Sequence, residues 1–96
     1  MPLLFRVEEV FEVKGRGIVL VPPTEGGLDT STKPGDEVQL RTPDGLLIES
    51  RISSIEFLHG IDKNGEKFCR MAIMLPTNIG KNRISKGAEV WSRIGQ

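Results

Sequence analysis

The chain has 96 residues and a mass of 10.6 kDa, which is enough for one hydrophobic core but not for a nucleotide-binding domain with a second domain beside it. Thirteen Lys and Arg side chains balance thirteen Asp and Glu side chains, so the formal net charge is zero and the chain has no broad positive field to attract nucleic acid. A hydrophobic share of 38% is too high for a disordered chain, and no apolar run is long enough to span a bilayer.

The cysteine count and the start of the chain indicate where the protein resides. The single cysteine, Cys69, cannot form an internal disulfide, which fits a reducing compartment. Arg6, Glu8 and Glu9 interrupt the apolar residues near the start, so this segment is not a signal peptide. We therefore predict one cytoplasmic domain over residues 1–96, with no membrane association.

The first third of the chain predicts two strands and a long loop. Residues 3–13 alternate with a period of two, which indicates a half-buried strand with a bulge or change of face at Glu9 and Val10. A tight turn at residues 15–17 leads into an aliphatic second strand over residues 18–21. Two prolines end that strand, and residues 22–34 are predicted to form a mobile loop beside the 15–17 turn.

The remaining chain predicts four more strands. Residues 35–58 form a predicted hairpin with its turn at residues 43–45, and a change of parity near Ser53 and Ser54 indicates a bulge in its second strand. A polar turn follows over residues 59–67, then a central strand over residues 68–75. Residues 76–87 are expected to be irregular, with one short helical turn over residues 81–85, before a last strand over residues 88–94. The fold class predicted is all-β, as a small six-stranded closed antiparallel barrel, because closure removes exposed edges.

Five segments occur in the order found in a known domain. The chain resembles the second, barrel domain of elongation factor Tu and related translational GTPases in five segments distributed between residues 5 and 91, namely 5–19 (FRVEEVFEVKGRGIV), 33–38 (KPGDEV), 54–57 (SIEF), 71–75 (MAIML) and 84–91 (ISKGAEVW). The resemblance implies a translation-protein barrel standing alone. Members of the family that the chain resembles use this barrel to contact a GTPase domain, tRNA and the ribosome. No phosphate-binding loop of the Gly-x-x-x-x-Gly-Lys-Ser/Thr type is present, so we expect no GTP binding by this chain.

The candidate binding residues are cations next to turns. Arg16 lies between Gly15 and Gly17, which are predicted to form the turn, and Lys14 precedes them. A second basic group, Lys81, Arg83 and Lys86, lies before the last strand and would position RNA phosphates rather than read bases. The competing interpretations are a turn that merely tolerates an arginine and a solvated basic loop without aromatic residues for stacking.

Catalysis and metal binding receive little support from the sequence. His59 has no ligand partner at the usual metal spacing, so no metal site and no cofactor is predicted. A nucleophile and base pair of Cys69 and His59 would need an accessible thiol, whereas Cys69 is predicted to be buried and inert in an apolar strand. Trp91, the single tryptophan, is predicted to be partly buried against the first strand. We expect a protein that is not an enzyme.

Two functions remain open at this point. The first is a non-catalytic binding module that contacts the ribosome, RNA or a translation factor, as the resemblance implies. The second is a protein–protein interaction module unrelated to translation. Both predict a protein or ribonucleoprotein partner, and neither the partner nor the oligomeric state follows from the sequence. Salt dependence separates the two, because phosphate contacts weaken steeply with salt and apolar contacts do not.

Overall fold

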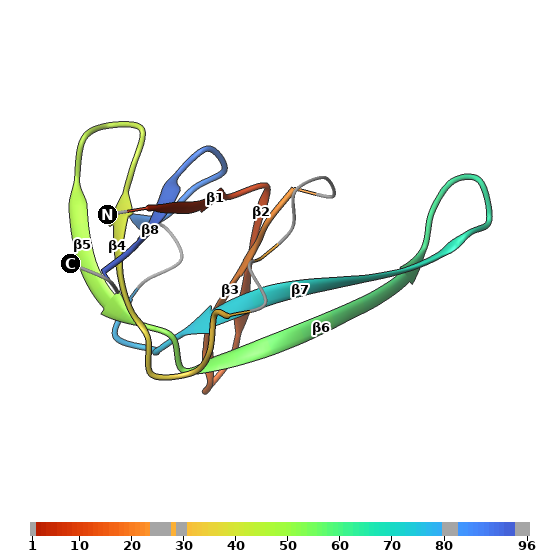
Figure 1. Cartoon of the computed structure of the whole chain (residues 1–96), viewed down its shortest axis with the longest axis horizontal. Coiled ribbons are helices and arrows are strands. Elements are labelled where there is room, and N and C mark those ends of the chain that lie inside the picture. Colours follow the sequence, from red (N-terminus) through yellow and green to blue (C-terminus); the bar gives the residue numbers. More distant parts are fainter. Residues whose placement is uncertain (1, 24–27, 29–30, 80–82, 94–96) are drawn as a thin grey trace.

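The computed structural model describes residues 2–23, 28, 31–79 and 83–93, and these residues form an all-β structure without an α-helix (Figure 1). Its strands form two antiparallel sheets, in the orders β1-β8-β4-β5 and β2-β3-β7-β6. The strand bounds are β1 (Leu3–Arg6), β2 (Glu9–Val13), β3 (Gly17–Val21), β4 (Glu37–Arg41), β5 (Leu47–Arg51), β6 (Ser54–Ile61), β7 (Lys67–Leu75) and β8 (Glu89–Ser92). The all-β prediction is confirmed, and β7 is a central strand as predicted.

The predicted six-stranded closed barrel is wrong, because the described residues form eight strands in two sheets of four. The difference arises at two corners. The predicted strand over residues 3–13 divides into β1 and β2, and the predicted strand over residues 46–58 divides into β5 and β6. The irregularity predicted near Ser53 and Ser54 lies where the chain leaves one sheet and enters the other, and the one predicted at Glu9 and Val10 lies just after the other such corner. Strands that switch sheets in this way form the corners between packed sheets.

Each corner is hydrogen-bonded to both sheets. At the first corner, Val7 N–H donates to the carbonyl of Ala88 at 2.7 Å, beside β8, while Glu8 N–H donates to the carbonyl of Val21 in β3 at 2.8 Å. At the second corner, Ile52 N–H donates to Asp36 O at 3.0 Å and Ser53 N–H donates to Met74 O at 2.8 Å. Adjacent residues therefore belong to different sheets, and the buried backbone groups at both corners are satisfied.

The main core lies between the two sheets. Its fully buried members come from β3, β4, β7 and β8, from both corners and from the residue before β8: Val7, Ile18, Leu20, Val38, Leu40, Ile52, Ile73, Leu75, Ala88 and Val90. Leu28, from the predicted loop over residues 22–34, also belongs to this core at 8% exposure. A smaller cluster of Val19, Val21, Ala72 and Met74 lies on the other face of sheet β2-β3-β7-β6.

The loop over residues 22–34 was predicted to lie beside the 15–17 turn, but it begins at the other end of β3. Pro22 follows Val21, which pairs with Glu9, whereas Gly17 pairs with Val13 at the opposite end of the β2–β3 ladder. The loop therefore starts far from the 15–17 turn along β3. The predicted mobility covers the whole loop, of which residues 24–27 and 29–30 lie outside the described part of the chain. Residues 81 and 82 of the predicted helical turn over residues 81–85 lie outside it as well.

The β6–β7 hairpin projects from the body along the longest dimension of the molecule, to the right in Figure 1. It is longer than predicted, because strand pairing continues to Ile61 and Lys67 and leaves only residues 62–66 for the turn that was expected over residues 59–67. The molecule extends 39 Å along this axis against 29 and 24 Å along the others. Within the described residues, no helix has the length and apolar character needed to cross a membrane.

Candidate functional site

The outer part of the β6–β7 hairpin is a two-stranded ribbon. Strand β3 pairs with β7 only at Ile73, Met74 and Leu75, so the rest of β7 is paired on one side alone, with β6. We call residues 56–72 the arm. Residues directly opposite each other in an antiparallel pair lie on the same face. One face of the arm therefore carries the pairs Phe57–Met71, His59–Cys69 and Ile61–Lys67, and we call these six residues the arm face.

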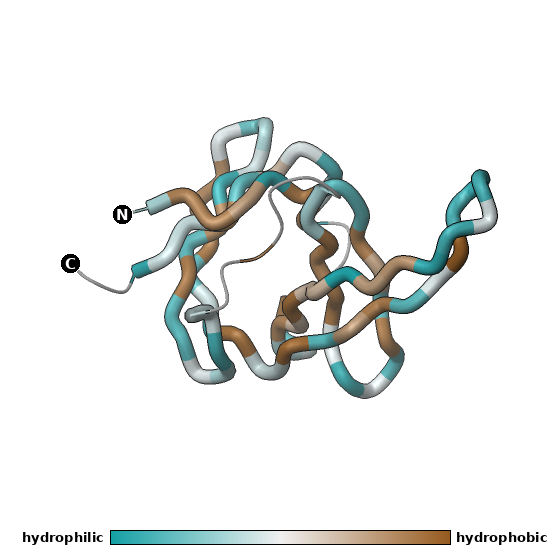
Figure 2. The backbone as a smooth tube through the Cα atoms, turned by 45° about the vertical axis from the view of Figure 1, so that its right-hand side comes forward, coloured by the Kyte–Doolittle hydropathy of each residue, from teal (hydrophilic) through white to brown (hydrophobic). Residues whose placement is uncertain are grey.

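The arm face continues the main core into solvent. At its base, the next pair on the same face is Ile55 with Ile73, of which Ile73 is buried in the core and Ile55 packs against it. Farther out, the side chains lose their cover, so that Phe57 is 58% and Ile61 68% exposed. Figure 2 shows hydrophobic segments along the arm beyond the body of the protein. An apolar surface that leaves the core and stays uncovered indicates a contact surface.

The opposite face of the arm is covered by its own side chains. The Phe68 ring lies over Gly60, where an added Cβ would approach the ring to 2.5 Å, so only glycine fits beneath it. The Arg70 guanidinium lies 5.5 Å from the centre of the Phe68 ring, and Leu58 packs against the smaller cluster. The two faces therefore differ, since one is closed within the chain and the arm face is open.

The structure brings His59 and Cys69 together. They are direct cross-strand partners on the arm face, a position in which Cβ atoms lie about 4.5–5.5 Å apart, and both residues are exposed. The prediction that Cys69 is buried is wrong, because this part of β7 extends past β3 and nothing in the described chain covers it. No group of three or more His, Cys, Asp or Glu side chains suited to a metal ion occurs among the described residues.

The first predicted cationic site is the β2–β3 turn. Lys14 and Arg16 are exposed there, and no ion pair joins either of them to another described residue. Gly15 and Gly17 have φ values of 80° and 144°, a backbone conformation that favours glycine. A shallow hollow beside the turn is also lined by Thr77 and Ile79.

The predicted cations do not form one patch. The Lys86 ammonium lies 3.5 Å from the Glu8 carboxylate, and Glu8 is at the opposite end of β2 from the Lys14–Arg16 turn. Arg83 is exposed, and Lys81 lies outside the described residues. Because Lys86 is paired and distant from the turn, the structure places the candidate cations in separate regions.

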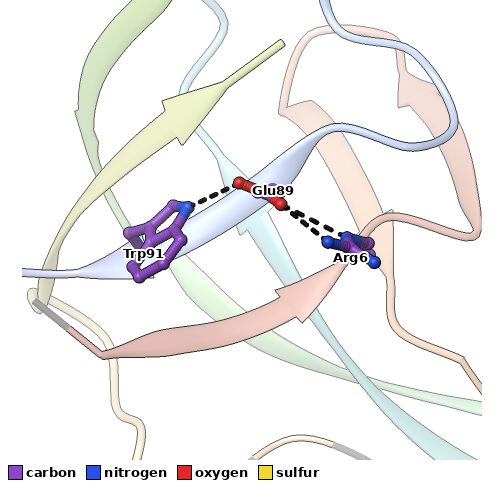
Figure 3. A network of polar contacts seen from close by, with 3 residues as sticks. All are labelled: Arg6, Glu89 and Trp91. Carbon is purple, nitrogen blue, oxygen red and sulfur yellow. Dashed lines mark hydrogen bonds and ion pairs between the residues drawn. The ribbon is translucent and has the colours of Figure 1, made fainter. Parts of the chain in front are cut away.

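Trp91 takes part in a polar network on the outer face of sheet β1-β8-β4-β5 (Figure 3). Its Nε1–H donates to Glu89 Oε1 at 3.0 Å, and Arg6 donates to Glu89 Oε2 through Nε and Nη2 at 3.2 and 3.1 Å. The Arg41 guanidinium lies 4.3 Å from the centre of the indole ring. Trp91 is half-buried and pairs with Leu3 of β1, as predicted. The polar groups of this surface are engaged in contacts with one another, whereas the apolar side chains of the arm face are uncovered.

Comparison with known protein families, curated proteins and solved structures finds no match to the chain. The resemblance to the second domain of translational GTPases therefore stays a prediction. Sequence reasoning missed the arm because residues 59–67 read as a polar turn. The available signal was the period-two series Ile55, Phe57, His59 and Ile61, which continues the strand past the expected end.

Proposed function

We propose that this chain is a non-catalytic protein-binding module that docks on its partner through the arm face. The observation that carries the proposal is the apolar face that runs from the core into solvent with Phe57 and Ile61 more than half exposed. An isolated two-stranded ribbon is at best marginally stable in water, and an uncovered apolar face adds no stability to it. A partner that covers the arm face would supply that stability and gain apolar contact area.

The setting of His59 and Cys69 favours binding over catalysis. Both lie on a projecting ribbon, and the open depression beside His59 is lined by Gly60, Ile61, Lys67 and Phe68 but not by Cys69. Enzymes hold nucleophile and base in concave sites that bury most of a substrate. We therefore assign the pair to a contact surface.

The test compares two matched double variants. The double variant Phe57→Ser with Ile61→Ser removes apolar groups from the arm face. The control, Leu46→Ser with Leu47→Ser, removes exposed apolar groups at the start of β5, where Leu46 precedes the strand and Leu47 is its first residue. We expect immobilised chain to retain host-cell proteins at low and high salt, and only the arm-face variant to lose them. Circular dichroism checks that both variants stay folded. Equal retention by the two variants would contradict the proposal.

A second candidate function, contact with ribosomal RNA, follows from the exposed Lys14 and Arg16 on a glycine turn, without an ion pair to the described residues. It agrees with the resemblance to translation factors. Co-sedimentation with ribosomes should then fall steeply with salt and with Lys14→Gln and Arg16→Gln together, because phosphate contacts release counterions. Co-sedimentation that survives both changes would argue against it.

A further inference from the structure

The centre of the arm face holds two side chains of the kinds that bind metal ions. His59 and Cys69 are directly opposed on adjacent strands, and both are exposed on the same face. Imidazole nitrogen and cysteine thiolate are the ligands of structural zinc sites, which are almost always four-coordinate. One chain supplies only these two, since it contains a single histidine and a single cysteine. Two further ligands of the same kind would complete a Cys₂His₂ set.

A second copy of the chain supplies them by symmetry. His59 and Cys69 form the middle pair of the arm face, between Phe57–Met71 toward the body and Ile61–Lys67 toward the tip. A two-fold axis that lies between two arm faces, level with the middle pair and perpendicular to the strands, stacks these faces in opposite directions. The Phe57 end of each copy then lies over the Ile61 end of the other. The same rotation brings two imidazoles and two thiols to the axis. The backbones of packed sheets lie about 10 Å apart. Histidine and cysteine side chains from both sheets can reach a zinc ion midway between them at the usual zinc–ligand distances of about 2.0–2.3 Å.

Charge does not oppose this pairing. The arm carries Glu56, Asp62 and Glu66 against Lys63, Lys67 and Arg70, so it is balanced. On the arm face itself, Lys67 lies two residues from Cys69, which places the two Lys67 side chains of a pair about 14 Å apart on opposite sides of the axis. That separation exceeds the screening length of about 8 Å at physiological salt. The aliphatic part of each Lys67 side chain would lie near the exposed Phe57 of the other copy.

We propose that two copies of this chain pair through their arm faces and bind one Zn²⁺ through His59 and Cys69 of each copy. Each thiol releases its proton to solvent as its sulfur coordinates zinc, so two protons leave for every ion bound. The inference rests on the proposed function of the arm face and names its partner as a second copy. The interface is small, with three cross-strand pairs on each side, which is typical of weak association without the metal.

The experiment is sedimentation velocity on tag-free, reduced chain treated with EDTA and then titrated with ZnCl₂, with MgCl₂ as the control ion. We expect monomer before zinc, conversion to dimer that saturates at one zinc for two chains, and reversal by EDTA. At limiting protein concentration the dimer dissociation constant should fall by about tenfold or more, because zinc binds only the paired state. Co²⁺ in place of zinc should give the absorption of a tetrahedral site with thiolate ligands.

Three variants separate the parts of the inference. Cys69→Ser and His59→Ala should each abolish the response to zinc, and both change exposed side chains. Asp62→Asn with Glu66→Gln removes oxygen ligands at the tip and should leave the response unchanged. A chain that stays monomeric with zinc, a complex of one zinc per chain, or a dimer that ignores EDTA and Cys69→Ser would each overturn the zinc-bridged pair. Host proteins retained through the arm face by a chain that never dimerises would uphold the proposed function while overturning this inference.

Discussion

At the scale of single residues, Glu89 shows how a surface carboxylate is held by its neighbours. The hydrogen bond from the Trp91 indole, followed by those from Arg6, holds the pKa of the Glu89 carboxyl below its ordinary value of 4.5. Hydrogen bonds from Arg93 and Gln39 lower the pKa of Glu49 in the same way. Both carboxylates lie on the outer face of sheet β1-β8-β4-β5, so the charged form of that surface is favoured in the folded state.

The sign of the resulting pH dependence follows from linkage. Because the folded pKa of Glu89 is lowered, the unfolded chain takes up a proton at higher pH than the folded chain. Its contribution is therefore present above pH 4.5 and is lost as the pH falls below that value. We predict that Glu89→Gln reduces the loss of thermal stability between neutral and acid pH, measured by circular dichroism melts. Glu12→Gln, which changes an exposed residue of β2, serves as the control. If Glu89→Gln loses as much thermal stability on acidification as the unchanged chain does, the prediction is contradicted.

At the scale of elements, the β2–β3 turn depends on two glycines with different surroundings. Gly15 has φ 80° and open space where a Cβ would lie, whereas a Cβ at Gly17 (φ 144°) would come within 1.9 Å of the Leu75 carbonyl oxygen. Gly17 is therefore fixed by the close approach of β7 as well as by its dihedral angle. This close approach joins the turn to the strand that continues into the arm.

The two positions give a matched pair of substitutions. We predict that Gly15→Ala costs about 1–2 kcal/mol, the cost of a side chain at positive φ. Gly17→Ala should cost on the order of 3 kcal/mol or more, because backbone atoms of β7 must also move. Urea unfolding followed by Trp91 fluorescence measures both. Equal losses would show that the Leu75 contact relaxes without cost.

At the scale of the whole molecule, the two corners and Leu28 connect parts that are distant in sequence. The corners at Val7–Glu8 and Ile52–Ser53 hold the sheets together through backbone hydrogen bonds to both. Leu28 reaches the main core from a segment between β3 and β4 in which Pro22 and Thr32 are also buried. The chain between these strands is thus attached to the core by at least one side chain.

Leu28→Ala tests this attachment. A buried leucine loses about 2–5 kcal/mol of stability when it is truncated to alanine, so we predict a loss in this range from urea unfolding. Leu47→Ala makes the same chemical change at a residue that is 62% exposed, and should cost less than about 0.5 kcal/mol. A neutral Leu28→Ala would show that Leu28 does not stabilise the core in solution.

The sequence by itself determined the fold class, most strand positions, the turn glycines and, to within a few residues, the places where two strands change direction. These features depend on local alternation and on turn residues, which act over a few positions. Only the tertiary structure decided that the changes of direction at residues 7–8 and 52–53 are corners between two sheets, because a change of parity fits a bulge and a corner equally well. The tertiary structure also decided which residues come together in the candidate site. His59 and Cys69 are ten residues apart in the chain, and only the register of β6 against β7 makes them neighbours, while the end of pairing with β3 leaves them exposed.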